Sequence, residues 1–364
     1  MIPVAAPVLG DKEIEYVVDC IRSGWVSSLG DYVRRFEREF AAYCGVRYGV
    51  ATHNGTVALH LVLAALGIGQ GDEVIVPSLT FVATGNAVAY TGASPVFVDS
   101  DPLTWTIDPQ AVARAITPRT RAIIAVHLYG HPADMDALRV LADEHGLILI
   151  EDAAEAHGAR YKGRRTGSLG DVAVFSFYGN KIITTGEGGM IVSDDEALIE
   201  RCYFLENQAK ARENPYWHTE IGYNYRMTNL QAALGVAQLE RIEEFIAARL
   251  RNAHHYNQRL KDVPGITLPP CAEWAMNVYW MYTILIEDEF GLSRDALMAH
   301  LRERGIETRP VFYPLHRLPM YNCGQSLPVA EDIARKGINL PSGSALTPAE
   351  VDAVCDAIIE RARR

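Results

Sequence analysis

Short apolar segments alternate with helical or loop-like stretches between about residue 70 and residue 195. Their sequences are EVIVP (73–77), SPVFVD (94–99), AIIAV (122–126), LILIED (147–152), VAVFSF (172–177) and GMIVS (189–193). Strands that are covered on both faces need such near-continuous valine, isoleucine and leucine content. Between two of these segments, residues 134–146 show helical spacing and end at Gly146. The alternation predicts an α/β fold with a mostly parallel sheet and helices on both sides.

Helical and strand patterns flank this region on both sides. Residues 11–24 have an apolar stripe at helical spacing, and residues 55–67 form a more apolar helical segment. One long helical stretch is predicted from Thr228 to Leu260, and its length is typical of a strut between two domains. Further on, residues 277–287 predict a strand and residues 293–305 a helix.

The chain length supports a division into two domains. Its 364 residues are long for a single compact core. We expect a large domain over residues 1–245, which holds the parallel sheet, and a smaller C-terminal α+β domain over residues 246–364.

Composition excludes several classes of protein. The net charge of −11 and the lack of a Lys/Arg run argue against nucleic acid or an anionic membrane as the main partner, although a local pocket could still bind an anion. The six cysteines lie far apart without a CxxC pair, which is untypical of a zinc site or a disulfide scaffold and fits reduced thiols. The N-terminus has no signal-peptide pattern, and no segment has the roughly 20 apolar residues of a membrane span. We therefore expect a cytoplasmic protein without a metal.

Two motif-like patterns have simpler explanations. GIGQG (67–71) has glycines at dinucleotide-like spacing, but it follows a predicted helix and precedes a strand, the reverse of the fingerprint order. His127 and His131 in HLYGH lie four residues apart, but Gly130 and Pro132 disfavour the helix that would align them as metal ligands.

Two stretches near the predicted sheet edge suit ligand binding. Gly55 and Thr56 open a predicted helix, and N–H groups at a helix start bind phosphate well, although an ordinary helix cap uses the same residues. Phe81 follows the strand EVIVP and is expected at the carboxyl edge of the sheet, where ligands gather in open α/β folds. A core aromatic is the alternative for Phe81.

Two further stretches carry ionisable groups to the same edge. Asp152 ends the strand LILIED, and a buried carboxylate there needs a cationic partner such as a protonated pyridine nitrogen. Lys181 lies in the stretch FYGNKIITTGEGGM (177–190), and Ser176 comes directly before this stretch. Burial would lower the pKa of a lysine there and make its amine a nucleophile, whereas a surface lysine is the alternative. A phosphate cradle, a stacking aromatic, a carboxylate and an amine together predict a site for pyridoxal 5′-phosphate.

Long stretches of the chain resemble the sugar aminotransferases of the DegT/DnrJ/EryC1/StrS family. They include IPVAAPVLGDKE (2–13), EDAAEAHGARYKG (151–163), GSLGDVAVFSFYGNKIITTGEGGM (167–190), GYNYRMTNLQAALG (222–235) and RPVFYPLHRLPMY (309–321). The resemblance covers essentially the whole chain. It implies the aspartate aminotransferase-like fold, known as pyridoxal phosphate fold type I.

The resemblance also implies roles for individual residues. Lys181 would form the Schiff base with the cofactor, and Asp152 would pair with its pyridine nitrogen. Phe81 would stack on the ring, and the phosphate would be held by three residues, Gly55, Thr56 and Ser176. Lys181 further distinguishes the chain from family members that act as dehydratases, which typically have histidine at this position.

Two positions bear on assembly and on a departure from the family pattern. In the family, the asparagine that is Asn224 here reaches the phosphate of the neighbouring subunit, which implies a homodimer with shared active sites. Glu155 stands where many members have glutamine or histidine, so its contact with the ring hydroxyl is in doubt.

The branch that makes GDP-perosamine from GDP-4-keto-6-deoxy-D-mannose, with L-glutamate as amino donor, is the one the chain resembles most. Alternatives are a 3- or 4-aminotransferase for another GDP-, dTDP- or UDP-keto sugar, and a non-catalytic regulator that binds pyridoxal phosphate. The candidates for sugar contacts are Trp25, Ser27 and Ser28 in an N-terminal substrate arm, and Arg309, Tyr313 and His316 in the smaller domain. Core packing or turn formation would explain each of these residues as well.

Overall fold

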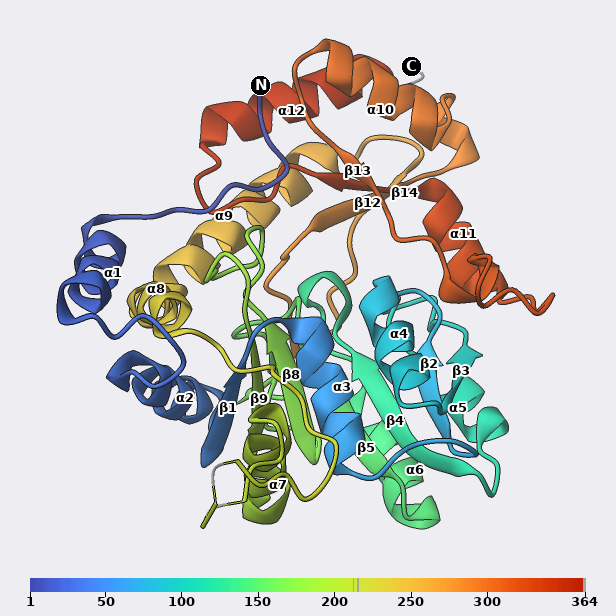
Figure 1. Cartoon of the computed structure of the whole chain (residues 1–364). Helices are drawn as coiled ribbons and strands as arrows, with labels where there is room; N and C mark the ends of the chain where they lie inside the picture. The colour runs from blue at the N-terminus through green and yellow to red at the C-terminus, as the bar shows by residue number, and fades with distance from the viewer. Residues whose placement is uncertain (212, 215, 363–364) are drawn as a thin grey trace.

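A seven-stranded sheet forms the centre of the protein (Figure 1). The computed structural model describes residues 1–211, 213–214 and 216–362. The strand order is β1 (Tyr48–Thr52), β9 (Gly189–Ser193), β8 (Val172–Ser176), β5 (Ile148–Asp152), β4 (Thr120–Val126), β2 (Glu73–Pro77) and β3 (Ser94–Val98). β9 runs antiparallel to both of its neighbours, whereas the pairs that join β8, β5, β4, β2 and β3 are parallel. The predicted α/β class with a mostly parallel sheet is confirmed.

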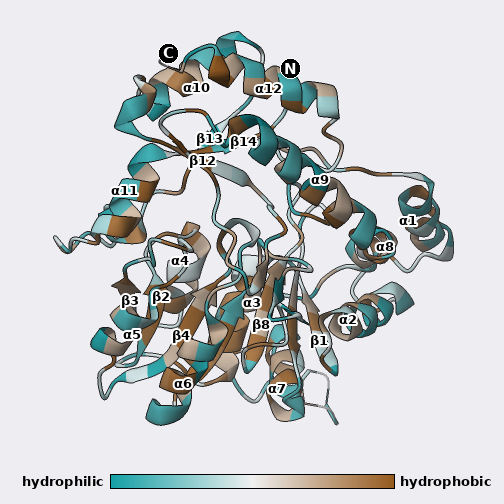
Figure 2. Cartoon of the chain, turned by 180° about the vertical axis from the view of Figure 1, so that it is seen from behind, coloured by the Kyte–Doolittle hydropathy of each residue, from teal (hydrophilic) through white to brown (hydrophobic). Residues whose placement is uncertain are grey.

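Helices cover both faces of this sheet, which explains the near-continuous apolar strands. Val74 and Val76 of β2 pack on one side with α3 (Gly55–Ala65) and α4 (Val82–Tyr90). Ile75, between them, packs on the other side with α5 (Pro109–Ala115) and α6 (Met135–His145). Figure 2 shows the same arrangement, because hydrophobic residues fill the central strands while the outer helices mix hydrophilic and hydrophobic residues.

Every strand predicted between residues 70 and 195 is present. The sheet has one further strand, β1, which lies before this range and was not predicted. Its sequence YGVAT is short and contains Gly49, which weakens a strand pattern. The glycine has a steric reason, since a Cβ there would lie 2.7 Å from the carbonyl oxygen of Glu37.

A second, four-stranded sheet lies above the central sheet in Figure 1, and α9 to α12 pack around it. Its strand order is β10 (Ile266–Thr267), β12 (Tyr282–Ile286), β14 (Gly337–Leu340) and β13 (Arg309–Pro310). The N-terminal segment joins this part, because Ile2 bridges to Ile306 and the Val4 carbonyl accepts a hydrogen bond from Ser342 N. The predicted domain boundary after residue 245 falls inside α9. The division into two domains stays a prediction.

The remaining elements complete the chain. They are α1 (Asp11–Ser23), α2 (Asp31–Cys44), η1 (Leu128–Gly130), β6 (Arg160–Tyr161), β7 (Arg164–Arg165), α7 (Glu196–Glu206), α8 (Asn229–Leu239), α9 (Ile242–Leu260), β11 (Ala275–Met276), η2 (Asp288–Phe290), α10 (Arg294–Glu303), η3 (Leu315–Arg317), α11 (Pro328–Lys336) and α12 (Pro348–Ile359). Within the described ranges, no helix is both long and apolar enough to cross a membrane.

The single long helix predicted from Thr228 to Leu260 is wrong, because α8 ends at Leu239 and α9 begins at Ile242. Arg241 interrupts the helical backbone with φ −115° and ψ 6°. The residues around it are good helix formers, so the break has a tertiary cause.

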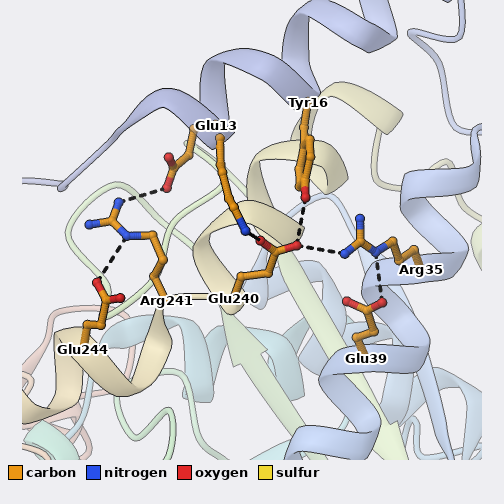
Figure 3. Close-up of polar contacts among 8 residues, drawn as sticks. Glu13, Tyr16, Arg35, Glu39, Glu240, Arg241 and Glu244 are labelled. Carbon is orange, nitrogen blue, oxygen red and sulfur yellow. Dashed lines mark hydrogen bonds and ion pairs between the residues drawn. The ribbon is translucent and has the colours of Figure 1, made fainter.

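Contacts with the two N-terminal helices hold the break in place (Figure 3). Glu240 pairs with Lys12 of α1 and Arg35 of α2, and it accepts a hydrogen bond of 2.9 Å from the Tyr16 hydroxyl. The next residue, Arg241, turns instead to Glu13 at 3.5 Å. Two adjacent side chains of a continuous helix point about 100° apart, so the interruption lets both reach α1.

Candidate active site

A cavity of about 590 Å³ lies between the central sheet and the second sheet. Its walls come from the carboxyl ends of β4, β5 and β8, the first turns of α3 and α4, and the segments around β12, β13 and β14. The structure brings these predicted site residues together in its lining: Gly55, Thr56, Phe81, Asp152, Glu155, Ser176, Lys181 and Arg309. All of them except Arg309 follow or end strands of the central sheet, and the carboxyl ends of parallel strands meet at one edge. Arg309 reaches the cavity from β13 of the second sheet.

Asp152 is the buried carboxylate at the end of β5. One oxygen accepts a hydrogen bond of 2.8 Å from the Thr84 hydroxyl, and the other accepts one of 3.2 Å from Ala154 N. Burial raises the pKa of Asp152, because a charged carboxylate loses hydration there, while these donors and the Lys181 ammonium lower it. The site therefore favours a further cationic partner for this group.

Glu155 is a second buried carboxyl in the same cavity. Its Oε2 accepts a hydrogen bond of 2.7 Å from Tyr129 N. Burial raises the pKa of Glu155 to about 7, the Lys181 charge opposes this shift, and the Asp152 charge adds to it. Glu155 can therefore exchange a proton near neutral pH.

Lys181 is held beside these carboxyls by the turn that follows β8. Its backbone N–H donates to the Tyr178 carbonyl at 2.9 Å, and its Nζ lies 3.7 Å from the centroid of the Trp280 ring. Burial lowers the pKa of Lys181, although Glu155 and Asp152 raise it. A lowered pKa makes the neutral amine more accessible at ordinary pH.

The first turn of α3 meets the end of β8 at close range. A Cβ on Gly55 would lie 2.8 Å from the Cβ of Ser176, so a larger residue would push the helix away from the strand. Asn54 caps the helix by accepting a hydrogen bond of 3.0 Å from Val57 N. The N–H groups of Gly55 and Thr56 precede the intrahelical bonds and, with Ser176, form a cradle suited to an anion.

Several predicted site residues lie outside this cavity. Trp25 and Tyr313 are 56% and 65% exposed, and neither belongs to the described cavity wall. The same holds for Ser27 and Ser28, in the loop between α1 and α2, and for Asn224, which is exposed and accepts a hydrogen bond from Arg226. Their roles stay predictions.

His316 is fully buried. Its Nδ1 lies 2.7 Å from the Ser78 hydroxyl, and its Nε2 lies 3.0 Å from Glu331. Both ring nitrogens are thus occupied, which favours a structural role for His316. Its predicted sugar contact has no support from this position.

Sequence reasoning missed other residues that line or support the cavity. Thr84 and Trp280 contact the two central ionisable groups, and Tyr129 holds Glu155. Thr84 lies one helical turn after Phe81, a spacing that would have indicated the same face. Tyr129 lies within HLYGH and has a left-handed φ of 53°, which local sequence gives little reason to expect.

Comparison with known proteins identifies the family. The model of the DegT/DnrJ/EryC1/StrS aminotransferase family matches residues 7–359. The chain belongs to this family. Together with the similar enzymes described next, this match shows an aminotransferase with pyridoxal 5′-phosphate as its cofactor, and the predicted family, enzyme class and cofactor are confirmed.

Individual family members are similar over almost their whole length. The chain is 49% identical to GDP-perosamine synthase of Caulobacter vibrioides, over 98% of this chain and 97% of that protein. It is 48% identical to GDP-perosamine synthase of Escherichia coli O157:H7, over 99% and 98%. Among solved structures, S. venezuelae DesV in complex with a ketimine intermediate superposes with a TM-score of 0.91 and 44% identity, over 97% of this chain and 94% of that one.

Proposed function

We propose that this enzyme transfers the amino group of L-glutamate to GDP-4-keto-6-deoxy-D-mannose and forms GDP-perosamine. The chain is 49% and 48% identical to two GDP-perosamine synthases over nearly its full length, and this similarity supports the substrate. The observation that carries the chemistry is the Lys181 amine in one cavity with the buried carboxyls of Asp152 and Glu155.

The residues present fit the cofactor. The cradle of Gly55, Thr56 and Ser176 suits its phosphate, and Asp152 suits the protonated ring nitrogen because burial leaves this carboxylate in need of a cation. Phe81, at the cavity wall, offers an aromatic face to the ring. Glu155 is assigned to the ring hydroxyl, with which it could share a proton.

Lys181 moves the protons of the reaction in this proposal. Pyridoxal 5′-phosphate, when bound, supplies an aldehyde that takes up the amino group and a ring that withdraws electrons from the carbon bearing it. Lys181 Nζ takes the proton from the carbon of L-glutamate that bears the amino group. In the second half of the reaction it returns a proton to the sugar carbon that receives the amino group. Asp152 keeps the ring nitrogen protonated. The two substrates use one site in turn, so ping-pong kinetics are expected.

Arg309 brings a guanidinium to the cavity lining, and this exposed side chain lies 3.3 Å from Glu307. Both L-glutamate and a nucleotide sugar carry anionic groups that suit a guanidinium. We assign Arg309 to substrate binding. Trp25, Ser27, Ser28 and Tyr313 are assigned to the sugar nucleotide outside the cavity.

The proposal includes a cytoplasmic homodimer. Asn224 is exposed in a single chain, as a residue that reaches a neighbouring subunit must be before assembly. In the described part of the chain all six cysteines are free thiols, which agrees with a reducing compartment.

An assay with keto sugars linked to GDP, dTDP and UDP tests the function. With L-glutamate as donor, we expect kcat/KM for the GDP sugar to be at least about tenfold higher than for the dTDP and UDP sugars. Lys181→Ala should lose turnover by at least about a thousandfold. A Lys181→Ala protein with full activity would refute the chemistry, whereas a preference for dTDP or UDP would refute only the substrate.

A further inference from the structure

The indole ring of Trp280 lies directly against the amine of Lys181. Nζ is 3.7 Å from the ring centroid, within the range of a cation–π contact. Lys181 follows β8 of the central sheet, whereas Trp280 precedes β12 of the second sheet. The contact therefore joins the two sheets at the cavity.

Several interactions fix the orientation of this indole. Its Nε1 donates a hydrogen bond of 2.8 Å to the carbonyl of Asn180, the residue before Lys181. Its ring stacks on Tyr129, with centroids 6.1 Å apart and planes at 26°. The backbone of Trp280 is held as well, because its carbonyl accepts a hydrogen bond of 2.9 Å from the buried Arg249 side chain. The Trp280 side chain thus contacts the backbone beside Lys181 and presents its ring face to the Lys181 amine.

Other charged groups also act on Lys181. Asp152 and Glu155 face it with negative charge from β5 and the loop after it. Buried His157 lies nearby, and burial lowers its pKa to about 3, so it is neutral at ordinary pH. These groups bear on the charge of the amine, while Trp280 contributes a rigid face that attracts the ammonium form and limits where Nζ can go.

We propose that Trp280 is a positioning residue for Lys181, whose indole face holds the amine in place for proton transfer in the cavity. The inference rests on the proposed role of Lys181. Because the ring favours the protonated form, its loss should make the lysine nitrogen easier to deprotonate and less well placed.

The test uses the holoenzyme with Trp280→Leu and Trp280→Phe. The visible absorbance of the lysine-bound cofactor is titrated from about pH 5 to about pH 10. We expect the midpoint to fall by about 0.5–1.5 pH units in Trp280→Leu, and by less in Trp280→Phe, which keeps an aromatic face. With L-glutamate, kcat should fall about tenfold in Trp280→Leu while KM changes by less than about twofold.

Trp274→Leu is the matched control, because Trp274 packs on Tyr161 and His131 and is not part of the described cavity wall. It should titrate as the wild type does. Should Trp280→Leu fail to fold, Trp280→Phe still has to show a smaller shift of the same sign. An unchanged midpoint in the folded Trp280 variants, or an equal shift in Trp274→Leu, would overturn the inference. A wild type without a lysine-dependent band would instead overturn the proposed role of Lys181.

Discussion

Asp152 depends on Thr84 for one of its two hydrogen bonds in the single chain. The Thr84 hydroxyl donates to Asp152 at 2.8 Å and lies 3.2 Å from the Thr80 hydroxyl. All three side chains are buried, so water does not readily replace a lost donor. The orientation of the carboxylate toward the cavity is therefore coupled to a threonine on α4.

Thr84→Val tests this coupling. It keeps the shape of the side chain but removes the donor, so we expect kcat/KM for L-glutamate to fall about tenfold or more, since an unpaired buried acceptor costs about 1–3 kcal/mol. Thr84→Ser keeps the hydroxyl and should stay within about threefold of the wild type. Steady-state kinetics with both variants measure the difference, and equal values for Val and Ser would contradict the coupling.

Residues at the ends of predicted strands could be placed from the sequence. Asp152 and Ser176 end apolar strands, and Lys181 follows one, so an edge location followed from the pattern. Trp280 could not be placed in this way, because its contact with Lys181 joins segments from two sheets. His316 had a polar side chain that suited a ligand, but its burial between Ser78 and Glu331 depends on packing that no local pattern encodes.

At the scale of elements, the break between α8 and α9 shows the same limit. The sequence QLERIEEF lacks a glycine or proline, so it predicts a continuous helix. Glu240 overrides that preference through its contacts with α1 and α2. The strands, by contrast, were predictable because their apolar content reflects burial on both faces.

Glu240→Ala should weaken the packing of α1 and α2 on α8. Burial opposes ionisation of Glu240, but hydrogen bonds from Lys12, Tyr16 and Arg35 lower its pKa overall. The stabilisation is therefore present above the unfolded pKa near 4.5 and is lost as the pH falls through the folded value. These contacts are largely exposed to solvent, so at pH 7 we expect the free energy of unfolding to fall by only about 1 kcal/mol.

Glu244→Ala is the control for this change, because Glu244 is exposed and its ion pair is with Arg241. Its effect should stay below about 0.5 kcal/mol. Urea unfolding at pH 7 and at about pH 4 measures both variants, and the difference between them should shrink at the lower pH. A difference that does not depend on pH would argue against the ionic contacts.

At the scale of the whole molecule, the proposed homodimer makes a testable demand on Asn224. If Asn224 serves the partner's site, Lys181→Ala and Asn224→Ala should complement each other in a mixed dimer. In a mixed dimer, one of the two sites has both residues intact, and random mixing of equal amounts makes about half of the dimers mixed. The mixture should therefore have about a quarter of the wild-type activity.

Each variant assayed alone, before mixing, is the control and should have little activity. Sedimentation gives the oligomeric state in parallel. A mixture no more active than its components, or an active monomer, would refute the shared site.

The N-terminal segment has a consequence for synthesis of the chain. Ile2 pairs with Ile306, and the Val4 carbonyl accepts a hydrogen bond from Ser342 N, so this segment has its partners far along the chain. During translation, these residues leave the ribosome long before those partners exist. Residues 2 to 4 can join these partners only after Ser342 has been made, and an N-terminal fusion that hinders this step should slow the docking of this segment more than the formation of the central sheet.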